Sequence, residues 1–320
     1  MQTALTQAPA LADIRAAHQR IQDKINRTPV MTSSTLNALC GAQLFFKCEN
    51  FQKIGAFKAR GAANAVFSLT AEAAALGVAT HSSGNHAAAL ARAARLRGIA
   101  AHIVMPEDAP STKIESVQRQ GGLITFCVPT LEARESGIAK IISETGATLI
   151  HPYDNYEVIA GQGTAALELL DDVPELDFIM APVGGGGLLS GTAIAAKALR
   201  ANIKVIAAEP ETADDARRSF LAGNLIPLGQ CNTIADGLRT SLSDKTFAII
   251  QSQVDDIITV SEASIVRAMR LVWQVMKIII EPSCALPLAV LLDNKLPASQ
   301  GRRVGIILTG GNVDLDKLPW

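Results

Sequence analysis

Aromatic residues are scarce in this chain, at 4% of its 320 residues, with two tryptophans and two tyrosines. Hydrophobic residues nevertheless reach 48%, and alanine is abundant among them, so we expect helices packed closely on a sheet. Charge of one sign is also lacking, because the net charge is −1 with 18% charged residues. This balance gives no support to binding of nucleic acid or of an anionic membrane.

Cysteine is sparse, and its spacing excludes the usual disulfide and zinc patterns. The five cysteines are odd in number and form no C-x-x-C pair, so we expect buried, reduced thiols in a reducing compartment. No basic region followed by an apolar one opens the sequence, and Lys277 interrupts the longest late apolar stretch. We therefore expect a cytoplasmic globular protein. The cysteines are Cys40, Cys48, Cys127, Cys231 and Cys284.

Short β-branched runs alternate with helical patterns, which indicates an α/β fold with parallel sheets and right-handed crossovers. The predicted strands are 44–48, 78–81, 102–105, 123–127, 148–150, 178–183, 205–209 and 303–308. The predicted helices include 85–97, 112–120, 131–145, 163–170, 188–199 and 261–276. We expect a large cofactor-binding domain of residues 1–76 and 151–320 and a small substrate-closing domain of residues 77–150. A ligand would lie between them, at the carboxyl ends of the strands.

Lys58 lies in the stretch Gly-Ala-Phe-Lys-Ala-Arg-Gly, residues 55–61. Apolar neighbours and the nearby cation Arg60 would both disfavour the charged form of this lysine. A neutral amine can condense with an aldehyde, most often pyridoxal phosphate. A solvated surface lysine is the alternative that this stretch alone leaves open.

Four consecutive glycines, Gly184 to Gly187, follow the apolar run 178–183 and precede a helical pattern. Backbone N–H groups can converge there on a phosphate at a helix N-terminus, although a tight packing turn would also use glycine. No Gly-Lys-Ser/Thr follows, so this is not a Walker loop. Glu209 lies where a dinucleotide fingerprint places its acidic residue, but Leu189 or Leu188 interrupts the G-x-G-x-x-G spacing.

Two polar clusters follow predicted strands. His81-Ser82-Ser83-Gly84-Asn85-His86 joins a strand to a helix, which suits N-capping by Ser82 or Ser83, either alone or together with a carboxylate site. The row 209–215 gathers carboxylates at a strand end, where hard cations bind. The alternative for that row is a capping box, Thr212-x-x-Asp215.

These motifs, in this order, resemble those of the fold-type II pyridoxal phosphate enzymes, which are tryptophan synthase β-like with two parallel-sheet lobes. The resemblance runs from about residue 27 to residue 314. It is strongest to the branch of serine racemase and the 3-hydroxyaspartate dehydratases (ammonia-lyases). The matching segments are Lys58 in its setting, Ser-Ser-Gly-Asn-His at 82–86, the four glycines, Thr-Gly-Gly-Asn at 309–312, and Phe-Lys-Cys-Glu-Asn-Phe-Gln at 46–52.

The resemblance implies how the cofactor would be held. Lys58 would bind pyridoxal phosphate through its ε-nitrogen, Asn85 would hydrogen-bond the ring hydroxyl, and the four glycines would hold the phosphate. Thr309 would meet the pyridine nitrogen, and a neutral hydroxyl there favours elimination over transamination. The implied cofactor contacts are Phe57, Lys58, Asn85, Gly184, Gly185, Gly186, Gly187, Leu188 and Thr309.

The resemblance also implies a substrate site and a metal site. Ser83 would be a second catalytic base beside Lys58, and Arg134 would meet a second substrate carboxylate, unless Arg134 belongs to a solvated helix face. A divalent cation (Mg, Mn or Ca) would bind Glu209, the Ala213 carbonyl and Asp215. The implied substrate contacts are Ser82, Ser83, Asn85, His86 and Arg134.

The leading hypothesis is a dehydratase that eliminates the β-hydroxyl of a small β-hydroxy amino acid, giving an imine that yields a 2-oxo acid and ammonia. We expect 3-hydroxyaspartate to be favoured, then serine or threonine, in a homodimer. Three alternatives stay open: a serine racemase with side dehydratase activity, a nicotinamide-dependent dehydrogenase, and a non-enzymatic amino-acid binding module. Cys284 departs from the family pattern, where Gly or Ala is usual. Ala88 and Ile54 also depart from it, which argues against activation by ATP.

Overall fold

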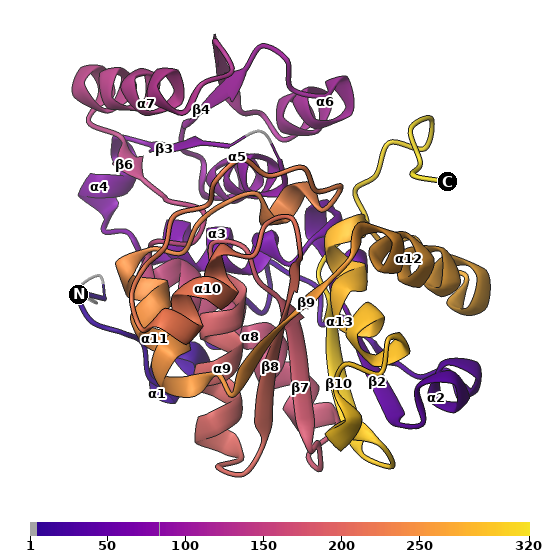
Figure 1. The fold of residues 1–320 in the computed structure, drawn as a ribbon. Coiled ribbons are helices and arrows are strands. Elements are labelled where there is room, and N and C mark those ends of the chain that lie inside the picture. The colour runs from indigo at the N-terminus through magenta and orange to yellow at the C-terminus, as the bar shows by residue number, and fades with distance from the viewer. Residues whose placement is uncertain (1–4, 83) are drawn as a thin grey trace.

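The computed structural model describes residues 5–82 and 84–320, and its strands form two separate sheets (Figure 1). The larger sheet has six strands in the order β1-β2-β10-β7-β8-β9, and the smaller has four in the order β5-β4-β3-β6. All neighbours pair in parallel except β1 and β2, which are antiparallel. β10, the last strand in the sequence, therefore pairs between β2 and β7 in the middle of the larger sheet.

The bounds of the strands follow the β-branched runs of the sequence. The larger sheet contains β1 (Val30–Met31), β2 (Gln43–Cys48), β7 (Phe178–Pro182), β8 (Lys204–Pro210), β9 (Asp256–Val260) and β10 (Arg303–Leu308). The smaller sheet contains β3 (Val78–His81), β4 (Ala101–Pro106), β5 (Leu123–Cys127) and β6 (Thr148–Leu149).

Helices cover both faces of each sheet. Those of the larger sheet are α1 (Leu11–Ile21), α2 (Ser34–Cys40), α3 (Lys58–Ser68), α8 (Tyr156–Asp172), α9 (Gly187–Leu199), α10 (Asp215–Ala222), α11 (Asp244–Gln253), α12 (Glu262–Met276) and α13 (Pro282–Leu292). Those of the smaller are α4 (Ala71–Ala75), α5 (Asn85–Arg97), α6 (Ser111–Arg119) and α7 (Leu131–Thr145). Single 3₁₀ turns are η1 (Glu49–Phe51), η2 (Lys53–Gly55), η3 (Asp236–Leu238) and η4 (Pro297–Ser299).

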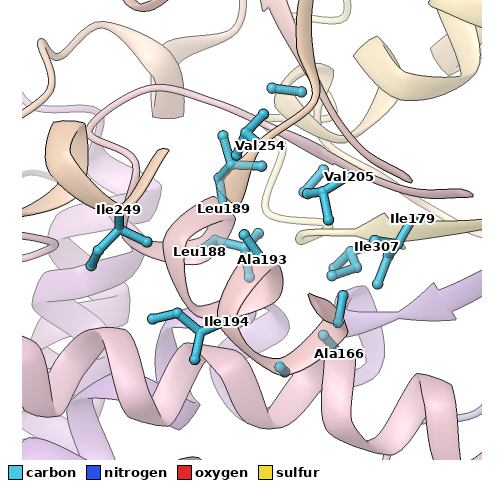
Figure 2. Close-up of a cluster of buried hydrophobic side chains, with 14 of the residues drawn as sticks. Ala166, Ile179, Leu188, Leu189, Ala193, Ile194, Val205, Ile249, Val254 and Ile307 are labelled. Atoms are coloured by element: carbon cyan, nitrogen blue, oxygen red, sulfur yellow. The ribbon is translucent and has the colours of Figure 1, made fainter. Parts of the chain in front are cut away.

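The core of the larger sheet has two layers, because side chains along a strand alternate between its faces. Ile179, Val205 and Ile307 face α8 and α9 in one buried cluster (Figure 2). Met180 and Ile306 face the opposite side and pack with residues of α12 and α13. Burial on both faces explains why β7, β8 and β10 are apolar over most of their length.

The smaller sheet is covered by α5 on one face and α7 on the other. The alanines of α5 are buried against it, as the scarcity of aromatic residues predicted. α3 packs against α5 and also against α8, so the helix that begins with Lys58 lies where the two lobes meet. Within the described residues, no helix is long and apolar enough to cross a membrane.

Candidate active site where the two lobes meet

Lys58 is the first residue of α3, and its Nζ donates a hydrogen bond to the Pro152 carbonyl at 2.9 Å. Burial lowers the pKa of Lys58 to about 8, and the opposing charge of Glu281 limits that fall. The prediction that Arg60 also disfavours the charged form of Lys58 is wrong, because its guanidinium is paired with Glu49 and Glu168. Desolvation alone thus makes the amine easier to deprotonate than an ordinary lysine.

The four glycines form the turn between β7 and α9, with Gly186 as N-cap at φ 85°. A Cβ at Gly185 would lie 2.3 Å from Cδ1 of Tyr153, and one at Gly187 would lie 2.9 Å from Cβ of the same residue. A Cβ at Gly184 would lie 2.8 Å from the Leu238 Cα. The backbone is therefore approached closely on several sides, and only glycine fits there.

Asn85 begins α5 from the small-lobe side, and two partners from the large lobe fix its side-chain amide. Its Nδ2 donates to both carboxylate oxygens of Glu281 at 3.1 Å, and its Oδ1 accepts from Asn312 Nδ2 at 2.8 Å. Burial raises the pKa of Glu281 to about 7, helped by the nearby charge of Asp236. The oxygen and the nitrogen of this amide are thus both held by the large lobe, so a ligand would share or replace one of the bonds to Glu281.

Thr309 follows β10 and is buried beside Cys284. The Thr309 hydroxyl and the Cys284 Sγ are 3.1 Å apart, and Sγ also donates to the Gly310 carbonyl at 2.7 Å. Burial raises the pKa of the Cys284 thiol, so this residue is a neutral neighbour of the hydroxyl.

The polar segment before α5 does not cap the helix in the expected way. The N-cap is Gly84, which has no side chain, and its N–H donates to Ser82 Oγ at 3.3 Å. N-capping by Ser82 is therefore wrong, and Ser83 lies outside the described residues. His86 is buried, and its Nε2 bonds to the Ile150 carbonyl at 2.9 Å. Burial and the charge of Lys58 lower the pKa of His86 to about 3, so its ring is neutral.

Further side chains reach this region from the end of β3 and from the loop after β6. His151 stacks edge-on with His81 at 5.9 Å and with Tyr153 at 4.6 Å between ring centroids. Burial lowers the pKa of His81, and the charge of Arg134 lowers it further. Arg134 is half-buried on α7, and its Nε donates to the Thr130 carbonyl at 3.3 Å. The effect of its charge on His81 indicates that Arg134 lies within electrostatic range of the end of β3.

The carboxylates at the end of β8 are buried close to one another. Glu209 accepts from the N–H groups of Ala216 and Arg217 at 2.9 Å, yet burial raises its pKa to about 8. Burial raises the pKa of Asp215 to about 6. Thr212 is not a helix cap, because the N-cap of α10 is Asp214. Within the described residues, no three His, Cys, Asp or Glu side chains gather as metal ligands.

Some residues of the site escaped the sequence reasoning. Glu281 and Tyr153 gave no local signal, and Asn312 belonged to the matching segment 309–312 but was assigned no role. Their partners lie far along the chain: Glu281 is 196 positions and Asn312 is 227 positions from Asn85. Pro152, which accepts from Lys58, is a backbone contact that no side-chain pattern encodes.

A lysine at a helix start and a glycine loop before a second helix are features that a site for a phosphorylated aldehyde cofactor requires. The chain belongs to the pyridoxal-phosphate dependent enzyme family, whose model matches residues 21–310. This finding confirms the predicted cofactor class and the fold-type II architecture, and it leaves the nicotinamide and binding-module alternatives without support.

The chain is similar to known members of this family over almost its whole length. It is 55% identical to the β-hydroxyaspartate dehydratase of Paracoccus denitrificans, over 98% of this chain and 99% of that protein. It is 50% identical to the serine racemase of Arabidopsis thaliana, over 97% and 95%. The structure of maize serine racemase superposes with a TM-score of 0.95 at 49% identity, covering 97% of this chain and 95% of that one. The predicted branch is thereby confirmed.

Proposed function

We propose that this protein is a pyridoxal-phosphate dependent dehydratase that converts a small β-hydroxy amino acid, 3-hydroxyaspartate in preference to serine or threonine, to a 2-oxo acid and ammonia. The observation that carries the proposal is the Lys58 amine, with a pKa lowered to about 8, on the lobe boundary near Asn85 and Glu281. Such an amine can hold an aldehyde covalently and can also accept a proton near neutral pH.

The residues of the site fit the cofactor. Backbone N–H groups of the glycine loop, at the start of α9, would bind the phosphate, with Phe57 and Leu188 as flanking contacts. Asn85 would donate to the ring hydroxyl, and the Thr309 hydroxyl would face the ring nitrogen. When bound, the cofactor supplies an electron sink for the substrate α-carbon.

The remaining steps belong to side chains of this chain. Lys58 would remove the substrate α-proton, after which the β-hydroxyl leaves and the released enamine becomes an imine that water hydrolyses. The start of α5, with Ser82, Asn85 and His86, would receive the α-carboxylate, favoured by the positive end of the helix. We keep Ser83 as a proposed second base, on the basis of the family resemblance alone.

The second carboxylate of 3-hydroxyaspartate requires a cation, and we propose Arg134 for that role. Its charge acts on His81 at the end of β3, which supports a position near the substrate space. Replacing Arg134 with Ala should reduce kcat/KM for 3-hydroxyaspartate at least about tenfold and affect serine much less, because serine has only one carboxylate. Lys140→Ala on the exposed part of α7 is the matched control. Equal losses for both substrates would remove the proposed role of Arg134.

The proposal has three further parts. We propose that the protein binds a divalent cation, that it forms a homodimer, and that residues 77–150 form the small substrate-closing domain. Glu209 and Asp215 are buried carboxylates with raised pKa values, and a cation (Mg, Mn or Ca) shared with the Ala213 carbonyl would favour their charged forms. The four-stranded sheet built from residues 78–149 supports the division of the chain into lobes.

The proposal is tested on the purified protein. It should be yellow, and borohydride reduction followed by peptide mapping should label Lys58; label on another residue, or none, would end the proposal. A panel of serine, threonine and the 3-hydroxyaspartate diastereomers then gives substrate preference through 2-oxo acid release. Racemised amino acid without 2-oxo acid would instead favour the serine racemase alternative, which relatives of that name make worth measuring.

A further inference from the structure

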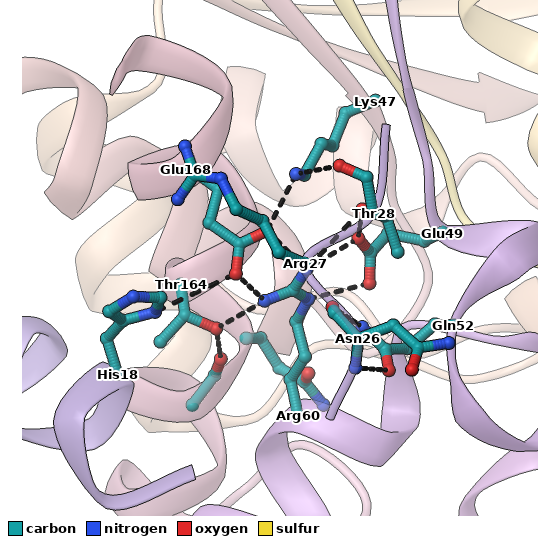
Figure 3. Close-up of polar contacts among 12 residues, drawn as sticks. His18, Asn26, Arg27, Thr28, Lys47, Glu49, Gln52, Arg60, Thr164 and Glu168 are labelled. Atoms are coloured by element: carbon teal, nitrogen blue, oxygen red, sulfur yellow. Dashed lines mark hydrogen bonds and ion pairs between the residues drawn. The ribbon is translucent and has the colours of Figure 1, made fainter. Parts of the chain in front are cut away.

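Arg60 is a fully buried arginine at the third position of α3, two residues after Lys58. Its Nε and Nη2 donate to Glu49 at 2.7 and 2.8 Å, and Nη1 and Nη2 donate to Glu168 at 2.8 Å each (Figure 3). Nη1 also donates to Thr164 Oγ1 at 3.1 Å. All five N–H hydrogens of the guanidinium thus have acceptors.

A second cation makes this group of charges neutral. Lys47 is also fully buried, and its Nζ donates to Glu168 Oε2 and to the Thr28 carbonyl, both at 2.7 Å. We call Lys47, Glu49, Arg60 and Glu168 the Arg60 cluster. Its two cations and two carboxylates join three segments of the chain: the continuous stretch from the end of β2 into η1, the start of α3, and α8.

Lys58 and Arg60 point to opposite sides of α3, because residues two positions apart on a helix are separated by about 200°. Arg60 enters the interior of the large lobe, whereas Lys58 reaches toward Pro152. The helix begins after Phe57, whose side chain cannot cap it; the Phe57 N–H donates to the Thr309 carbonyl at 2.9 Å. The Arg60 cluster is therefore the strongest side-chain anchor of the turn that carries Lys58.

We propose that Arg60 is a positioning residue that fixes the first turn of α3 and thereby the location of the Lys58 amine. Stability alone does not account for the cluster, since buried ion pairs are often no more stabilising than apolar residues of the same size. A planar guanidinium bound by a carboxylate at each edge, however, fixes the orientation of the helix turn that carries it. A lysine in its place cannot impose that orientation. The inference rests on the proposed role of Lys58.

Two variants separate positioning from stability. Arg60→Lys keeps the charge but cannot bridge both carboxylates. Arg60→Met with Glu49→Gln removes one charge of each sign and leaves the Lys47–Glu168 pair neutral. Ile257→Ala, a buried residue of β9, is the control for a loss of stability elsewhere in the large lobe. For each protein, the melting temperature without cofactor, the dissociation constant of pyridoxal phosphate and the fraction of Lys58 trapped by borohydride are measured.

We expect both Arg60 variants to bind the cofactor about tenfold to a hundredfold more weakly than wild type, with less label on Lys58, because small misplacements of a reacting group have effects of this size. Ile257→Ala should melt earlier but bind the cofactor within about twofold of wild type. The inference is overturned if Arg60→Lys binds as wild type, if the double variant regains full binding, or if binding follows melting temperature in all three. Absence of label on Lys58 in wild type would instead defeat the proposed function.

Discussion

Replacement of Gly185 with Ala is the sharpest test of the glycine loop. The added Cβ would lie 2.3, 2.4 and 2.4 Å from Cδ1, Cε1 and Cγ of Tyr153, whereas carbon atoms in contact prefer about 3.5–4.0 Å. Either the ring or the loop must therefore retreat by about 1 Å. Overpacking of this kind costs about 1–3 kcal/mol. Because both movements disturb the N–H groups of the loop, we expect pyridoxal phosphate to bind about 5- to 150-fold more weakly.

A second substitution decides whether Tyr153 is the cause. Tyr153→Ala removes the ring, so the double variant with Gly185→Ala should recover most of the binding. Gly187→Ala should not be rescued in this way, because its Cβ would meet Cβ and Cα of Tyr153, at 2.9 and 3.1 Å, which alanine keeps. Gly229→Ala is the control, since no described atom lies within 4 Å of a Cβ built there. Wild-type affinity in Gly185→Ala, or no recovery in the double variant, would refute the reasoning; an absorbance titration with cofactor measures both.

The lowered pKa of Lys58 predicts that cofactor-free protein gains stability as the pH rises from about 8 to 10.5, and Lys58→Met should flatten this rise in urea titrations. Glu281 has the opposite sign: its pKa of about 7 lies above the ordinary 4.5, so stability should fall across that interval, and Glu281→Gln should abolish the fall. For Glu209 and Asp215, added Mg²⁺ or Mn²⁺ should raise the melting temperature more at pH 8 than at pH 5.5, because a larger share of both carboxylates is charged at pH 8. An equal rise with Asp215→Asn would contradict the site.

The sequence predicted most of the sheet framework, because strong local patterns specify those elements. The strands 78–81, 123–127 and 303–308 and the helices 85–97 and 131–145 have the bounds expected. α8 begins at Tyr156 rather than at residue 163, because the Asn155 side chain caps the helix at the earlier position. β9 was missed, since five residues beside a polar turn give little periodic signal. Short, half-exposed elements depend on tertiary partners.

The predicted site was incomplete for a related reason. Lys58 and the glycine loop are recognisable because each needs particular residues at adjacent positions. Arg60 shows the limit of this reasoning. Its place two residues after Lys58 suggested that its charge lowers the pKa of Lys58, but its buried partners Glu49 and Glu168 neutralise that charge. Contacts such as Glu281 with Asn85 join residues far apart in the chain, and composition or spacing carries no record of them.

The central place of β10 has a consequence for biosynthesis. The strand that completes the middle of the six-stranded sheet, and Thr309 just beyond it, are synthesised after β2 and β7. Until β10 is made, β2 and β7 have no partner between them, so a nascent chain cannot complete the large sheet, and a variant without β10 would lose the whole large lobe.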